Sequence, residues 1–247
     1  MKGLWQLTWL EIKIFAREPL GLFGTVGVPV LVFLVLGRFL RATANPASPE
    51  EAFLQDGLPV LAAIMMTTSA VVSLVTIIAI YREGGILKRL RATPLHPVTI
   101  LTAHVLVKLL FTALTLGLLL AVGRRYYAPD TAMEFAAFAG ALLFSTAGVL
   151  SLGFLIASMV PTARFAQPLA AVIFYPMIAL SGLFFPSAVL PPSAREVVRV
   201  LPMTYVVSLL QGVWRGEALS SHLWDMAIIV LFGATFTALA SRFFRWE

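Results

Sequence analysis

Long apolar runs alternate with short polar segments along this chain, and the alternation predicts six helices that cross a membrane. The apolar runs cover residues 19–40, 58–80, 98–122, 133–160, 165–185 and 222–244. A helix needs about twenty apolar residues to cross the hydrocarbon core of a bilayer. The chain as a whole is 60% hydrophobic and 12% charged, unlike a soluble domain. We therefore predict an all-α integral membrane protein whose residues 1–247 form a single domain.

Residues 1–18 carry charges within an apolar sequence and predict an amphipathic helix at the membrane interface. At 100° per residue the polar side chains that fall on one face are Lys2, Gln6, Lys13 and Arg17, with Trp5 and Trp9 beside them. Glu11 and Glu18 point away from this stripe, so the amphipathic pattern is imperfect. A simple charged tail is the alternative reading.

Residues 186–221 form a second unusual segment, too apolar for a solvated loop and too interrupted for a membrane span. Pro191-Pro192 and Pro202 divide it into short pieces. We expect one helix from an N-cap at Ser193 to Val200 and another from Thr204 to Trp214. The two helices either dip into the outer leaflet or lie flat on its surface; irregular backbone at depth requires surrounding protein or water.

The segment at residues 81–97, YREGGILKRLRATPLHP, is the most strongly charged stretch between two apolar runs. We call it the coupling segment. Its apolar and basic residues alternate at helical spacing, which predicts an amphipathic helix of roughly two turns. Gly84-Gly85 would provide a flexible joint before this helix, and Thr93-Pro94 would end it. The alternative is a basic loop that only sets membrane topology.

Charge places the termini and the coupling segment on the cytoplasmic side. Ten basic residues lie on their side of the predicted membrane: Lys2, Lys13, Arg17, Arg82, Lys88, Arg89, Arg91, Arg164, Arg242 and Arg245. Seven lie on the other side: Arg38, Arg41, Arg124, Arg125, Arg195, Arg199 and Arg215. Because cytoplasmic loops carry the excess of Lys and Arg, both termini are expected in the cytoplasm.

Two motifs resemble the ABC-2 family of membrane subunits of ATP-binding-cassette transporters. The sequence from Arg82 to Leu95 resembles the family's cytoplasmic loop, which forms a coupling helix that docks on the ATPase subunit. Ser181–Pro186, followed by Leu201–Tyr205, resembles the end of the fifth helix and the re-entrant helices after it. The resemblance implies that ATPase coupling involves Arg82, Glu83, Gly84, Gly85, Ile86, Leu87, Lys88, Arg89, Leu90 and Arg91.

The same resemblance implies partners, location and cargo. It implies a second copy of the chain or a homologous permease, a separate cytoplasmic ATPase that binds ATP and Mg, and the cell membrane of a prokaryote. The sequence contains no phosphate-binding G-x-x-x-x-G-K-[ST] motif, so we expect a subunit that is not itself an enzyme. A hydrophobic or amphipathic cargo, drug-like or lipid, fits the Phe-rich spans. The alternatives are a polysaccharide or glycolipid exporter and an ion-coupled secondary carrier.

A few residues within the spans are candidates for a substrate path or gate. His104 and Lys108 are four residues apart and share a helix face; a role in helix packing or at the interface is the alternative. The aromatic candidates are Phe174, Tyr175, Phe184 and Phe185. The three histidines show no metal-ligand spacing and cysteine is absent, so we expect no metal or cofactor on this chain. Membrane lipid, and not nucleic acid, accounts for the net charge of +6.

Overall fold

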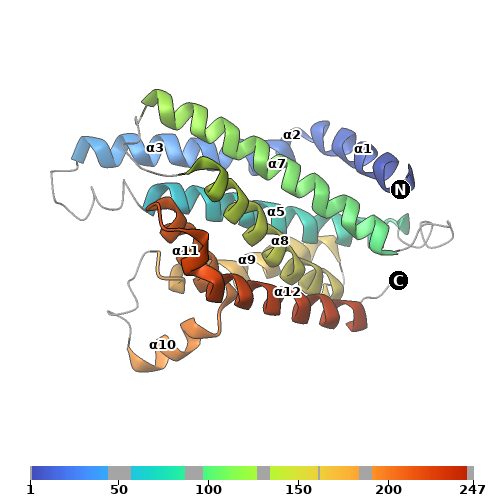
Figure 1. Ribbon diagram of the computed structural model, residues 1–247. Helices are drawn as coiled ribbons and strands as arrows, with labels where there is room; N and C mark the ends of the chain where they lie inside the picture. Colours follow the sequence, from blue (N-terminus) through green and yellow to red (C-terminus); the bar gives the residue numbers. More distant parts are fainter. Residues whose placement is uncertain are drawn as a thin grey trace.

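The computed structural model describes residues 2–43, 57–86, 97–126, 134–160, 162–183 and 191–243, and the regular structure in these ranges is helical (Figure 1). The helices are α1 (Lys2–Ala16), α2 (Pro19–Leu22), a π-helix (Phe23–Gly27), α3 (Val28–Thr43), α5 (Leu58–Glu83), α7 (Pro97–Tyr126), α8 (Phe135–Met159), α9 (Ala163–Leu180), α10 (Pro192–Arg199), α11 (Pro202–Trp214), a 3-10 turn (Leu219–His222) and α12 (Leu223–Phe243).

Six helical stretches in the described ranges are long and apolar enough to cross a membrane, as the hydrophobic pattern predicts. They are Pro19–Leu40, Leu58–Glu83, Thr102–Val122, Phe135–Met159, Ala163–Leu180 and Leu219–Phe243. Figure 1 shows α1 and the C-terminus at one end of the bundle, and the end of α3 with α10 and α11 at the other. This arrangement agrees with an even number of crossings.

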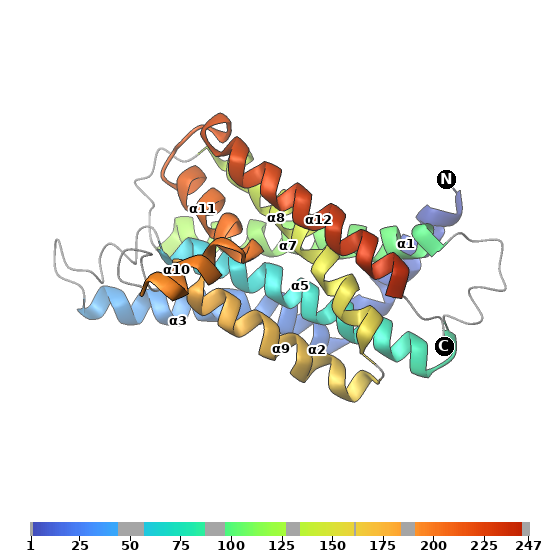
Figure 2. The ribbon, with the colours of Figure 1, turned by 90° about the horizontal axis from the view of Figure 1, so that it is seen from below.

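The second span, α5, is the central helix of the bundle. It packs against α3, α7, α8, α9 and α11, and Figure 2 shows it between α12 and α9. Of its most apolar window 61% is buried inside the chain, against 11% for the last span. Because α5 has neighbours on all sides, it is apolar on all sides and has no single apolar stripe.

Small residues let α12 approach α8 closely. A β-carbon on Gly148 of α8 would lie 2.4 Å from Cγ2 of Ile229 on α12, and one on Gly233 would lie 3.9 Å from the Gly148 Cα. Such contacts between small residues are how membrane helices pack without a hydrophobic driving force. Gly148 of the fourth span therefore packs directly against α12.

Several predicted boundaries are wrong, mostly at the end of the bundle opposite the termini. The third span continues as helix through Tyr126, whereas the apolar run that predicts it ends at Val122; glycine is well tolerated in membrane helices. The fifth span ends at Leu180 instead of Phe185, because Gly182 adopts a left-handed φ of 93°. The helix α10 begins at Pro192, so the N-cap is Pro191 and not Ser193; proline fits the first helical position.

The two short helices before the last span differ in burial. In α11 the buried side chains include Met203, Val206 and Leu210, and the helix packs against α8, α12, α5 and α9. Among the described side chains of α10, only Val198 is buried. The re-entrant interpretation therefore fits α11, which is inserted into the bundle, whereas α10 remains on its surface.

Candidate functional site

The coupling segment begins where α5 ends, at the same end of the bundle as the termini (Figure 1). Of its predicted coupling residues, Arg82 to Ile86 lie in the described part of the chain. The others, Leu87, Lys88, Arg89, Leu90 and Arg91, lie outside the described residues, as does the predicted exit at Thr93-Pro94. Ile86, the last described residue, is 36% exposed. The structure therefore defines the base of the coupling segment.

The glycine pair at this base ends the helix. The Gly84 N–H donates to the Ile80 carbonyl at 2.9 Å, and the Gly85 N–H donates to the Arg82 carbonyl at 3.0 Å. Gly85 has a φ of 65°, the left-handed conformation that commonly terminates a helix and that glycine adopts without strain. We interpreted the pair as a flexible joint; the structure gives it a defined helix-ending geometry.

Arg82 and Glu83 reach across to the junction between α8 and α9. The Arg82 guanidinium donates a hydrogen bond of 2.5 Å to the Val160 carbonyl. The Ala163 N–H donates to Glu83 Oε1 at 2.9 Å. Val160 is the residue at the C-cap of α8, and Ala163 is the first residue of α9. Two neighbouring charged side chains of α5 thus hold the end of one span and the start of the next.

Tyr81, one residue earlier, points to α1 instead. Its hydroxyl donates to Glu11 Oε1 at 2.8 Å, and Glu11 Oε2 lies 3.5 Å from His104 Nδ1 on α7. The rings of Tyr81 and His104 meet edge to face at 5.5 Å. Glu11 is only 5% exposed, so this carboxylate joins three helices in the interior.

Lys108 extends the same cluster by one helical turn. Its ammonium group donates to Ser73 Oγ of α5 at 2.6 Å and lies 4.0 Å from the centre of the Phe15 ring of α1. Lys108 and His104 are each 3% exposed. The shared helix face predicted for the two residues is confirmed, and both contact neighbouring helices of the same chain.

Burial raises the pKa of Glu11 above its ordinary value, while the Tyr81 hydrogen bond and the Lys108 charge lower it. A buried carboxylate is disfavoured in its charged form unless donors and a counter-charge surround it. Here both are supplied by other helices. The buried charges of α1 and α7 are therefore interdependent.

Sequence reasoning missed Glu11, Tyr81 and Ser73 as parts of this cluster. The available signal was the position of Glu11 opposite the basic stripe of α1, which we treated as an imperfection. In the structure Gln6, Lys13 and Arg17 of the stripe are exposed, as are Trp5 (70%) and Trp9 (50%), and Glu11 faces α7. Figure 1 shows α1 following the first part of α7. Its location at a membrane interface stays a prediction.

The aromatic candidates for a gate are not brought together. Phe174 is fully buried, with 0% exposure, whereas its neighbour Tyr175 is 66% exposed on the outer face of α9. Phe184 and Phe185 lie outside the described residues. Of Phe174 and Tyr175, only Tyr175 faces outward, where a substrate, lipid or second copy could contact it.

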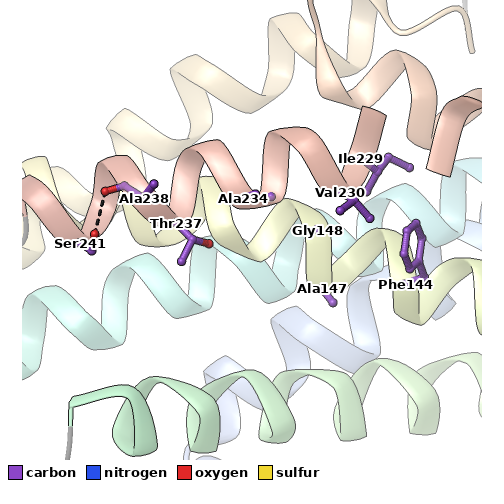
Figure 3. A pocket seen from close by; sticks show the side chains of 10 residues that line it. Phe144, Ala147, Gly148, Ile229, Val230, Ala234, Thr237, Ala238 and Ser241 are labelled. Carbon is purple, nitrogen blue, oxygen red and sulfur yellow. Dashed lines mark hydrogen bonds between the residues drawn. The ribbon is translucent and has the colours of Figure 1, made fainter. Parts of the chain in front are cut away.

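A shallow groove of about 550 Å³ lies between α8 and α12 (Figure 3). Its lining is Phe144, Ala147, Gly148, Ile229, Val230, Gly233, Ala234, Thr237, Ala238 and Ser241. None of these residues is charged. The Ser241 hydroxyl donates to the Ala238 carbonyl at 2.7 Å, so its hydrogen-bonding capacity is met within α12. The groove is therefore an apolar surface feature and not a reactive site.

His222 lies near the opposite end of the bundle, between two acids. Its Nδ1 is 2.9 Å from Asp225 Oδ2, and its Nε2 is 3.1 Å from Glu217 Oε2. Ser208 of α11 also donates to Asp225 Oδ2, at 2.9 Å. The cluster ties α11 to the start of α12. Across the described ranges, no group of three His, Cys, Asp or Glu side chains has the geometry to hold a metal ion.

The six apolar spans and the inserted helix α11 define a multi-pass membrane protein. The sequence model of the ABC-2 type transporter family matches residues 2–214, which cover five of the six spans and leave out the last one, Leu219–Phe243. The chain therefore belongs to the ABC-2 type transporter family and is a transmembrane subunit of an ABC transporter. No curated protein matches it.

Proposed function

We propose that this chain is the membrane subunit of an exporter that moves a hydrophobic or amphipathic molecule, drug-like or lipid. A separate ATPase subunit, with ATP and Mg, would supply the energy from the cytoplasmic side. The observation that carries the proposal is the basic coupling segment at the end of α5, the most deeply buried span. Force applied at that point enters the centre of the bundle.

A second copy of the chain or a homologous permease would complete the transport path. The spans Pro19–Leu40 and Ala163–Leu180 are each only 22% buried within one chain. They expose large apolar side chains, among them Phe39 (65%), Val172 (70%) and Tyr175 (66%). In a membrane such faces contact lipid or another protein. A path between two copies, lined partly by Tyr175, would suit a poorly charged cargo.

The test is to purify the chain with its ATPase and to replace Leu87 and Leu90 by Asp. We expect the double variant to lose ATPase binding while it still folds, because both side chains lie on the apolar face predicted to dock. Leu219→Asp, an exposed leucine at the other end of the bundle, is the matched control. Retention of the ATPase by the double variant would refute the docking role.

Cargo and direction require a second measurement. The complex is reconstituted in vesicles. The rate of ATP hydrolysis is then measured in the presence of a fluorescent phospholipid, a hydrophobic dye or a soluble oligosaccharide, and movement of each across the membrane is recorded. Stimulation by the lipid or dye, with movement away from the ATPase side, supports the proposal. Stimulation by the oligosaccharide alone would assign the chain to the polysaccharide branch.

One observation favours a second candidate, an ion-coupled carrier that works without an ATPase. Such carriers need an ionisable group within the protein interior, and Glu11 with His104 forms one that the sequence did not reveal. Purified chain alone in vesicles, under a proton gradient, would accumulate dye if this were correct. Family membership and the coupling segment favour the ATP-driven alternative.

A further inference from the structure

Three consecutive side chains at the end of α5 contact three different parts of the bundle. Successive residues of an α-helix project about 100° apart, so Tyr81, Arg82 and Glu83 together cover about 200° of arc. They reach Glu11 of α1, the end of α8 and the start of α9 respectively. The last helical turn before the coupling segment is therefore connected to more than the two spans that flank the segment.

The contact of Glu83 with α9 is a helix cap supplied from another helix. The N-cap residue of α9, Thr162, makes no side-chain capping hydrogen bond. The first N–H groups of a helix have no partner within the helix, and the Ala163 N–H finds its acceptor in Glu83. A carboxylate is also favoured at a helix N-terminus by the helix dipole. Glu83 thus contributes directly to the position of the start of α9.

Arg82 fixes the other side of the same junction. Its guanidinium bonds the carbonyl of Val160, whose own N–H donates to Ile156 of α8. A hydrogen bond from a charged donor is stronger than a neutral one. Together the two charged residues keep the α8–α9 junction in register with the end of α5.

The body of α9 follows α5 closely. Its buried residues, Ala166, Ala170, Phe174 and Met177, recur at helical spacing on one face, and the two helices pack along each other. Pro168 and Pro176 interrupt the internal hydrogen bonds of α9, and proline positions are where helices bend. A shift imposed on the start of α9 would therefore change its bend relative to the rest of the bundle.

We propose that Arg82 and Glu83 are positioning residues that transmit movement of the coupling segment to α9. This inference rests on the proposed function and changes the role of these two residues. They act within the chain, on α9, the span that carries the exposed Tyr175. The contacts with the ATPase are made by the later residues of the coupling segment. Movement of the coupling segment then reaches the fifth span directly through the bonds of Arg82 and Glu83, in addition to the second and third spans that flank the segment.

The experiment measures whether α9 moves when nucleotide binds. The chain has no cysteine, so spin labels can be placed at Leu169 of α9 and Leu239 of α12, which are 38% and 39% exposed. The distance between them is recorded by pulsed electron resonance in the complex with its ATPase, with and without a non-hydrolysable ATP analogue. Glu83→Ala is compared with Glu134→Ala, an exposed glutamate at the start of α8 that makes no capping bond.

We expect the unaltered chain and the Glu134→Ala variant to show the same nucleotide-driven change in distance. In Glu83→Ala the change in distance should be largely lost, because the start of α9 is no longer bonded to the end of α5. A full distance change in Glu83→Ala would overturn the inference and leave the proposed function standing.

Two further arms keep the result decisive. If Glu83→Ala does not fold, Glu83→Gln replaces it; this variant keeps an acceptor but loses the charge, and a partial loss of the distance change is expected. Ala163→Pro removes the N–H that donates to Glu83 at a position where proline fits the first turn of a helix, and it should reduce the change in distance as Glu83→Ala does. No nucleotide-driven change in the unaltered complex would contradict the proposed function itself.

Discussion

The buried carboxylate of Glu11 provides a direct test of how α1 is held to the bundle. Glu11→Ala would leave the Tyr81 hydroxyl without its acceptor and remove the negative charge that acts on Lys108. Removing one partner of a buried charge pair costs about 3–5 kcal/mol. For a chain of this size the corresponding fall in the melting temperature is roughly 10 °C. Thermal unfolding of the detergent-purified chain measures it.

The second half of the test removes the opposing charge. In the double variant Glu11→Ala with Lys108→Met, no uncompensated charge remains, and methionine fills a similar volume at low strain. We expect most of the lost melting temperature to return. Lys13→Ala, an exposed charge on the same helix, should change stability by less than about 0.5 kcal/mol. If the double variant is no more stable than Glu11→Ala, the interdependence of the charges is wrong.

Three further outcomes follow from the local geometry. Burial raises the pKa of Glu11 above its ordinary 4.5, so the melting temperature of the unaltered chain minus that of Glu11→Gln should be largest below pH 4.5 and shrink as pH rises; a difference that grows with pH would contradict this. Gly212→Ala places a β-carbon 1.9 Å from His222 Nε2 and should destabilise by about 2 kcal/mol in thermal unfolding, whereas Gly140→Ala, with open space around it, should not. Gly85→Ala, at a φ of 65°, should destabilise by about 1 kcal/mol, measured as local hydrogen exchange at the end of α5.

The sequence was sufficient to predict the spans because burial in a membrane is a property of a whole segment. Twenty apolar residues in a row have one stable location, whatever their neighbours are. The end of α5 near the termini was also predictable, since charge must lie in water: α5 ends at Glu83, three residues beyond the predicted Ile80. Boundaries at the opposite end of the bundle depended on single prolines and glycines, and there the predictions failed, as at Leu180 and Pro192.

The contacts that organise the candidate site could not be predicted in the same way. Glu11 and His104 are far apart in the sequence, and only the packing of α1 along α7 brings them to 3.5 Å. In a hydropathy pattern Glu11 is only a polar residue on the apolar face of an amphipathic helix. The pattern does not show that a carboxylate facing the interior needs hydrogen-bond donors from other helices. An acid on the wrong face of an amphipathic helix, with a histidine or lysine inside a later span, is the pattern that would have indicated this cluster.

The end of α5 shows why a polar helix terminus can be a mechanical junction in a membrane protein. Apolar contacts between spans are numerous but weakly directional, because hydrocarbon side chains and lipid tails are nearly equivalent partners. Hydrogen bonds have a defined geometry and fix the relative position of two helices. Tyr81, Arg82 and Glu83 place three such bonds within one turn, immediately before the coupling segment. A displacement of this turn must therefore move its three neighbours or break these bonds, whereas the apolar interfaces higher in the bundle can slide.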